Sequence, residues 1–307
     1  MDARSSQLDS LAILLVVLCC ASWGLQQVAI KVANAGISPI LQAGLRSAGA
    51  AVLVWAWSSA RGIRLFDRDG SLWLGIAIAV LFGGEFAVIY VALEFTTAAR
   101  GAIFLYTAPF FVALGAHFLI PGERLRGGKA VGLLGAFLGV AVAFSDSLAL
   151  PSHREFIGDA MMVLAGFLWG ATTVLIKATR LARLSALKTL IYQLAGSALL
   201  LVPLSPLLGE KGVTDPSALV LLLLGYQIVF VAFASYIAWF WLIARYPASA
   251  LSSFTFLTPI FGLLGGAILL HEPVGLRLIV AIALVGAGIY LVNGRPRAKG
   301  GTRGPSS

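Results

Sequence analysis

Apolar residues fill ten segments of this chain almost without interruption, and polar residues gather in the short stretches between them. A helix needs about 20 apolar residues to cross the hydrocarbon core of a bilayer. Strands are excluded, because no alternation of polar and apolar positions appears and open sheet edges cannot face lipid. The predicted membrane helices are Leu11–Val32, Pro39–Ala60, Ser71–Leu93, Ala98–Ile120, Gly128–Ser145, Ile157–Ala178, Ala186–Leu208, Ser217–Ala244, Ala248–Leu270 and Leu276–Asn293.

The second half of the chain repeats features of the first. Trp23 and Lys31 have counterparts in Trp169 and Lys177, both offset by 146 residues. Each repeat contains five predicted helices, and since five is odd, the second repeat enters the membrane from the opposite side. Inverted repeats are typical of secondary transporters, which bind substrate between the repeats near the bilayer midplane. We therefore predict an all-α integral membrane protein with a central cavity, in which residues 1–150 and 151–294 form the two inverted five-helix repeats and 295–307 form a disordered basic cytoplasmic tail.

Composition supports a membrane protein. The chain is 59% hydrophobic and 11% charged, with a mean hydropathy of +0.95, whereas a soluble domain carries about 25% charged residues. The net charge of +9 comes from short basic clusters between apolar segments, which argues against a nucleic-acid partner. Cys19 and Cys20 are adjacent within an apolar segment and show no metal or redox spacing. We therefore predict buried free thiols, no metal site and no cofactor.

The distribution of lysine and arginine predicts the orientation. If the N-terminus is cytoplasmic, sixteen basic residues lie at cytoplasmic ends and five at external ends, a strong positive-inside bias. We therefore expect a multi-pass protein of a bacterial-type inner (plasma) membrane, with both termini in the cytoplasm. The external set is Lys31, Arg100, Arg154, Lys211 and Arg277.

Four stretches carry a family resemblance. They are Ser22-Trp23-Gly24 with Lys31; Gly44-Leu45-Arg46-Ser47-Ala48; Tyr106-Thr107-Ala108-Pro109 leading to Gly122-Glu123-Arg124-Leu125; and Phe256-Leu257-Thr258-Pro259 leading to His271-Glu272-Pro273-Val274.

Together these stretches resemble the EamA-type members of the drug/metabolite transporter superfamily, over nearly the whole chain. The resemblance implies a ten-helix inner-membrane carrier for small metabolites, often an exporter. Within the superfamily the chain is also similar to amino-acid exporters of the YddG kind. One departure is that Ser197 stands where the second repeat should match Arg46.

Glu85 lies near the middle of the third predicted helix. A charged side chain at that depth costs about 2.5–3.5 kcal/mol on insertion scales, so it should face a cavity or a partner, or be protonated. It could contact a substrate amine or carry a proton. Alternatively it forms a structural ion pair with Arg46, the other charged residue near mid-helix, and the sequence favours neither alternative.

Trp23 and Trp169 lie halfway along equivalent helices, away from the interfaces where tryptophans gather. Gln27 and Thr173 follow each of them at i+4, on the same helix face. We predict that these four side chains line the substrate cavity. The alternative is that the glycine after each tryptophan packs against a neighbouring helix.

Tyr106 and Phe256 occupy matched positions three residues before Pro109 and Pro259. Proline lacks an amide donor and frees a carbonyl group, so each helix can bend or expose backbone toward a cavity. We predict that the two aromatic residues bind substrate and that the prolines break the helices and act in gating. A static kink remains an equal alternative.

The eighth predicted helix presents Gln227, Ser235 and Trp239 on one face, at spacings of eight and four residues. We predict that all three bind substrate. Lys31 and Lys177 are predicted to extend toward opposite membrane surfaces.

The residues favour transport over other functions. An intramembrane enzyme needs a nucleophile with a base, paired carboxylates or a metal cluster, and a channel needs a filter or a charged ring; neither pattern is present in the sequence. We therefore predict a secondary transporter, working as a monomer, that exports amino acids (aromatic or other neutral ones) or similar small metabolites by rocking of its two halves. The alternative substrates are drugs, nucleosides or other metabolites of the same superfamily.

Overall fold

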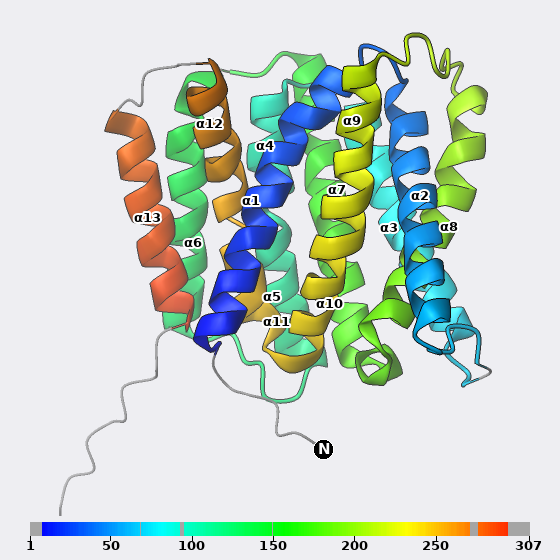
Figure 1. Ribbon diagram of the computed structural model, residues 1–307. Coiled ribbons are helices and arrows are strands. Elements are labelled where there is room, and N and C mark those ends of the chain that lie inside the picture. Colours follow the sequence, from blue (N-terminus) through cyan, green and yellow to red (C-terminus); the bar gives the residue numbers. More distant parts are fainter. Residues whose placement is uncertain (1–7, 68, 93–94, 149, 271–275, 294–307) are drawn as a thin grey trace, which may run out of the picture.

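The computed structural model describes residues 8–67, 69–92, 95–148, 150–270 and 276–293. The predicted tail, the His271-Glu272 motif and the side chain of Gln27 lie outside this description. The helices are α1 (Ser10–Ala33), α2 (Pro39–Ala60), α3 (Leu72–Ala92), α4 (Ala98–Leu105), α5 (Ala108–Leu119), α6 (Gly127–Ala143), α7 (His153–Ala178), α8 (Ala186–Leu207), α9 (Ala218–Tyr226), η3 (Gln227–Ser235), α10 (Tyr236–Arg245), α11 (Ala248–Phe254), α12 (Leu257–Leu270) and α13 (Leu276–Asn293), with short 3-10 turns η1 (Ser145–Ser147) and η2 (Arg180–Arg183) (Figure 1).

These helices make ten apolar crossings, as predicted. Eight helices or helix pairs are long and apolar enough to span a membrane, and two shorter apolar stretches, Ser10–Gln26 and Gly127–Ala143, complete the set. Two crossings are broken, the fourth into α4 and α5 and the ninth into α11 and α12. The eighth runs through α9, η3 and α10, of which η3 is a π-helix. The predicted all-α membrane fold is confirmed.

The polar side chains of this fold lie inside and large apolar ones lie outside, the reverse of a water-soluble bundle. Gln42 and Arg46 are completely buried, whereas Leu199 and Leu222 are exposed on the outer surface. A lipid environment explains this arrangement, since hydrocarbon solvates leucine and leaves polar groups to be satisfied within the protein.

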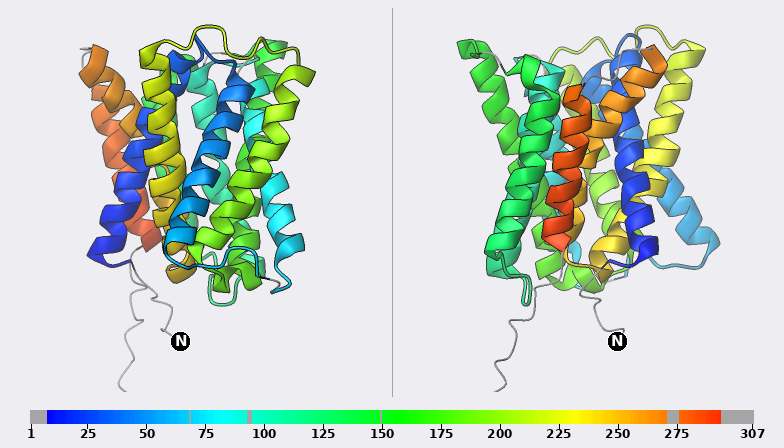
Figure 2. Two further views of the ribbon diagram at one scale, coloured as in Figure 1. Left: turned by 45° about the vertical axis from the view of Figure 1, so that its right-hand side comes forward. Right: turned by 90° about the vertical axis from the view of Figure 1, so that its left-hand side faces the viewer.

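The helix contacts follow a twofold pattern. α7 packs against α3, α4 and α5, and its counterpart α1 packs against the α9–η3–α10 crossing, α11 and α12. The remaining counterparts pair directly, α2 with α8 and α6 with α13, the latter side by side in Figure 2. The first helix of each repeat therefore packs on the third and fourth crossings of the other repeat. The two repeats interlock and do not form separate bundles.

Charged residues near the helix ends tie the bundle together. Arg100 of α4 pairs with Asp159 of α7 at 2.5 Å, and both side chains are buried. In the segment between α2 and α3, Asp69 accepts a hydrogen bond from Lys188 at 2.8 Å, and that ammonium group, assisted by Ser71, holds the pKa of Asp69 well below its usual value. These contacts connect the first repeat to the second.

The prediction for Lys177 was wrong. Lys177 does not extend to the membrane surface: it is buried, and its Nζ donates to the carbonyl oxygens of Ile243 and Tyr246, each at 2.5 Å. These carbonyls belong to the end of α10, where the last turn of a helix leaves acceptors without partners and favours a cation. Lys177 therefore caps α10.

Candidate functional site

Four aromatic rings from three crossings meet in the interior of the bundle. The ring of Trp23 on α1 lies edge-on to Tyr236 (centroids 6.1 Å apart) and to Trp239 (5.2 Å), both on α10. Phe82 on α3 lies edge-on to Tyr236 at 6.0 Å. Edge-to-face geometry is the preferred arrangement of such rings. The structure thus brings Trp23 and Trp239 together as predicted site residues, and adds Tyr236 and Phe82, which the sequence analysis did not identify.

Ser235 anchors this aromatic cluster. The indole Nε1 of Trp23 donates to Ser235 Oγ at 2.8 Å, and Ser235 Oγ donates to the carbonyl oxygen of Val231 at 2.6 Å. Cys19 Sγ donates to the carbonyl oxygen of Ser235 at 3.5 Å. Ser235 ends the π-helix η3, and π-helical turns are frequent at functional sites. The wide turn sets both the serine and the rings after it against α1.

Arg46 and Glu85 lie buried beside this cluster without forming an ion pair. Arg46 has none of its side chain exposed, and its Cζ lies 4.1 Å from the centre of the Phe86 ring. Glu85 is 7% exposed. Within the described part of the chain no ion pair joins Arg46 to Glu85, so the structural pair, one of the two alternatives, is not present.

Several buried polar atoms near these charges lack hydrogen-bond partners among the described residues. They include all three guanidinium nitrogens of Arg46, the hydroxyl of Tyr90, and both amide atoms of Gln227. The Oε1 atoms of Gln42 and Gln193 are unpaired as well. A buried polar group without a partner costs about 1–3 kcal/mol, and such groups in a native structure call for an explanation. Gln42 and Gln193 were missed as candidates, although a glutamine deep in an apolar segment is itself a signal.

A smaller aromatic pair joins the two repeats. Trp169 on α7 lies edge-on to Tyr106 at 5.8 Å, and Thr173 is buried one turn further along α7. Phe256 is buried and lies edge-on to Phe110 at 6.3 Å, away from Trp169. Of the predicted residues, Trp23 thus contacts Ser235 and Trp239, and Trp169 contacts Tyr106.

The glycines beside the two tryptophans have a packing role. A Cβ added to Gly24 would lie 2.6 Å from the carbonyl oxygen of Thr258 on α12, and one added to Gly170 would lie 2.7 Å from Cβ of Phe111 on α5. Both distances are too short for a real contact. The packing interpretation thus holds for the glycines, while the adjacent Trp23 ring still faces the aromatic cluster.

The helix breaks lie just before the two prolines. α4 ends at Leu105 and α5 begins at Ala108, so Pro109 occupies the second position of α5. α11 ends at Phe254, and Pro259 is the third residue of α12. In both breaks a threonine hydroxyl adds a hydrogen bond to a carbonyl that also accepts from the backbone: Thr107 Oγ1 donates to Phe104 O and Thr255 Oγ1 donates to Ser252 O, each at 2.7 Å.

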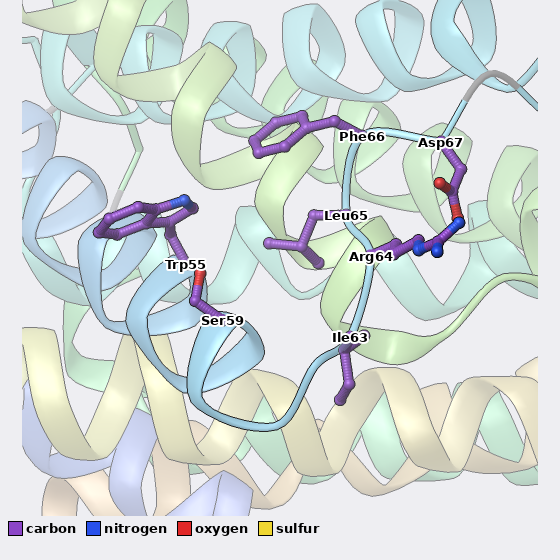
Figure 3. Close-up of a pocket in the computed structure, with 7 residues that line it drawn as sticks. All are labelled: Trp55, Ser59, Ile63, Arg64, Leu65, Phe66 and Asp67. Atoms are coloured by element: carbon purple, nitrogen blue, oxygen red, sulfur yellow. The ribbon is translucent and has the colours of Figure 1, made fainter.

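Two hollows on the surface lie apart from these residues. One, of about 300 Å³, lies between the end of α2 and the segment that follows it (Figure 3). The other, of about 390 Å³, lies beside Arg100 and Asp159. Neither is lined by any predicted site residue. Arg46, Trp23 and Trp239 are buried, and neither hollow reaches them.

The chain matches the model of the EamA-like transporter family twice, over residues 10–145 and 156–294. A "Probable amino-acid metabolite efflux pump" of Escherichia coli (strain K12) is 28% identical over 299 residues, covering 93% of this chain and 95% of the relative. An "Uncharacterized transporter" of Archaeoglobus fulgidus is 30% identical over 277 residues, covering 88% of this chain and 94% of the relative.

A solved crystal structure shares the fold. It superposes with a TM-score of 0.81, covers 92% of this chain and 96% of its own, and is 20% identical, which supports the fold alone. The family and its named members are transporters and efflux pumps, not enzymes. The family model matches both halves of the chain, and the fold makes ten apolar crossings. This multi-pass membrane protein therefore belongs to the EamA-like transporter family.

Proposed function

We propose that this protein exports amino acids or similar small metabolites from the cytoplasm across a bacterial-type inner membrane, by alternating access. Relatives named as amino-acid metabolite efflux pumps, in Escherichia coli and Salmonella typhimurium, support the substrate class. Membership of the family supports transport of the solute through the helix bundle.

The observation that carries the proposal is the set of buried, unpaired polar groups next to the aromatic cluster. Arg46 and Gln227 are completely buried, and their side-chain nitrogens make no hydrogen bond to a described residue. Polar groups at membrane depth are expensive unless a partner meets them. A polar solute that enters from one side and leaves on the other would meet them transiently. Each contributes more to binding such a solute than to stability.

The helix contacts suggest which units move. Because each repeat's first helix packs on the third and fourth crossings of the other repeat, rocking of one five-helix half against the other would break the contacts of both first helices. We propose instead two exchanged units, α1 with α9 to α12 and α7 with α3 to α5. Rocking of these units around the aromatic cluster would preserve those contacts and expose Trp23 alternately to each side.

A flux measurement on purified protein in liposomes tests the function. We expect counterflow of at least one neutral amino acid from a radiolabelled panel of amino acids, nucleosides and cationic drugs, above that of protein-free liposomes, with and without an imposed proton gradient. Flux confined to nucleosides or drugs would contradict the amino-acid assignment. Absence of flux for every solute would contradict transport.

A conservative variant tests the site. Trp23→Phe removes the Nε1 donor to Ser235 and keeps an aromatic ring in the cluster, so we expect flux to fall about tenfold while the protein remains folded. Trp73 of α3 is 80% exposed, so Trp73→Phe should leave flux unchanged. Equal flux in both variants would argue that Trp23 only packs.

Orientation can be tested by cysteine labelling. α1 begins and α13 ends at the same end of the bundle (Figure 1), and the distribution of basic residues favours a cytoplasmic location for that end. Single cysteines at Ser5 and Ser307 should react with an impermeant maleimide only in inverted vesicles, and one at Ser152 only in intact cells. Cys19 and Cys20 are buried, so the unmodified chain should provide an unreactive control. Labelling of both termini in intact cells would reverse the orientation.

A further inference from the structure

We propose that Arg46 and Glu85 together recognise a zwitterion: Arg46 binds the carboxylate of the transported solute and Glu85 binds its ammonium group. This inference rests on the proposed transport function and specifies the chemistry of its substrate. It requires an α-amino acid with both groups free and an uncharged side chain.

The state of Arg46 argues for an anionic ligand. Its side chain is completely buried, and Nε and both terminal nitrogens make no hydrogen bond to a described residue. Only the Phe86 ring, 4.1 Å from Cζ, lies against it as a favourable contact for a cation. A guanidinium carries five donors in a rigid fork that matches a carboxylate through two parallel hydrogen bonds. The unused fork of Arg46 is thus suited to a carboxylate.

Glu85 supplies the opposite charge at the same depth. Arg46 is the eighth residue of α2, which begins at the end of the bundle where α3 terminates, and Glu85 lies seven residues before that terminus. At 1.5 Å per residue both lie about 10 Å from the same end. They do not form an ion pair, yet the Arg46 guanidinium lies against the ring of Phe86, the residue that follows Glu85. A ligand with two opposite charges on neighbouring atoms can join them.

The surrounding rings determine the rest of the ligand. The rings of Phe82 and Phe86 lie edge-on to one another, with centroids 5.0 Å apart, on the same helix as Glu85. Tyr236 also lies edge-on to Phe82. Such walls favour an apolar or aromatic side chain. A second carboxylate would face Glu85 and a second cation would face Arg46, so acidic and basic amino acids should bind more weakly. A doubly charged anion such as phosphate would also be repelled by Glu85.

Both charges come from the first repeat. The positions in the second repeat that correspond to Arg46 and Glu85 hold Ser197 and Ser235, which are buried but neutral. Ser197 Oγ lies 3.2 Å from Ser47 Oγ, beside Arg46 in the sequence. The twofold arrangement of helices therefore surrounds a single charged pair and not two equivalent pairs. This argues for one zwitterion per transport cycle.

A ligand series on the unmodified protein tests the proposal. Phenylalanine, phenylethylamine, 3-phenylpropionate and phenylalaninamide share one ring and differ in which charged group they carry. We expect phenylalanine to compete with radiolabelled leucine for counterflow, and each of the others to compete roughly a hundredfold more weakly, since a site built to bind a polar group rejects an analogue without it. Equal competition by all four compounds would overturn the proposal.

Two variants test whether Glu85 binds the ammonium group of the ligand and Arg46 its carboxylate. Glu85→Gln should bring 3-phenylpropionate close to phenylalanine in competition while leaving phenylethylamine weak. Arg46→Gln should have the opposite selectivity. Ser47→Ala, on the same helix as Arg46, is the matched control and should leave the ligand order unchanged. If either variant weakens all four compounds by the same factor, its residue only supports the structure and the assignment fails.

The failure of this inference can be told from failure of the proposed function. If no neutral amino acid moves but another solute of the panel does, transport stands and zwitterion recognition falls. If no solute moves through protein that is folded, both fall. Should Arg46→Gln not fold, the ligand series on the unmodified chain and on Glu85→Gln still decides the matter.

Discussion

Replacing Asp159 with alanine is expected to lower the free energy of unfolding by about 3–5 kcal/mol, the range for removing one partner of a buried ion pair. Asp159 Oδ2 accepts from Arg100 Nη2 at 2.5 Å and from Arg100 Nε at 3.1 Å, and its Oδ1 accepts from Thr96 Oγ1 at 2.7 Å. Side-chain exposures of 6% for Arg100 and 7% for Asp159 allow little solvation by water. The substitution removes the carboxylate that neutralises Arg100 and leaves a buried cation behind.

A second ion pair of the same bundle provides the control. Asp146 contacts Arg277, but their side chains are 81% and 60% exposed, and exposed pairs contribute about 1 kcal/mol or less. Equilibrium unfolding in mixed detergent should therefore show little change for Asp146→Ala and a large loss for Asp159→Ala. Similar small changes in both variants would show that the Arg100–Asp159 pair contributes no more than a surface pair.

Replacing Gly288 with alanine is expected to destabilise the contact between α6 and α13 by about 1–3 kcal/mol, the usual penalty for overpacking. A Cβ at Gly288 would lie 2.5 Å from both the backbone nitrogen of Ala136 and the carbonyl oxygen of Gly132. These are backbone atoms and cannot rotate away, so the two helices would have to separate. Helices that pack in lipid depend on such small residues for close approach.

Gly286, two residues earlier on α13, is the matched control. Nothing lies within 4 Å of a Cβ built there, and alanine is favoured over glycine within a helix by about 1 kcal/mol. Gly286→Ala should therefore leave thermal unfolding in detergent unchanged or raise its midpoint, while Gly288→Ala lowers it. Equal midpoints for the two variants would mean that α6 and α13 are not as closely packed as described.

Arg46 and Glu85 make the two repeats chemically unequal, although the helices of the repeats are arranged alike. Helix contacts are arranged twofold, with α1 and α7 in equivalent surroundings. The chemistry is not, since Arg46 and Glu85 stand where the second repeat has serines. Inverted repeats are typical of transporters whose bundle alternates between two conformations, and we propose that the unequal charges select the solute.

The ten crossings could be predicted from the sequence, because in hydrocarbon each backbone group must be satisfied within its own helix. Pro39–Ala60 and Leu276–Asn293 were predicted with the bounds that the structure has. The residues and motifs also predicted a transporter of this family and not an enzyme. The comparisons with known proteins confirm the transporter family.

The sequence by itself thus determined the crossings, the repeat and the class of protein, since each is local or is counted along the chain. The tertiary structure decided which side chains meet. α3 is apolar on all its faces, so no periodicity shows that Phe82 meets Tyr236 of α10 or that Glu85 stands near Arg46 without pairing. Lys177 was expected at the surface and is buried, because the carbonyls that hold it belong to a helix 66 residues away in the chain. Packing between distant helices depends on all of them together, and no single apolar segment encodes it.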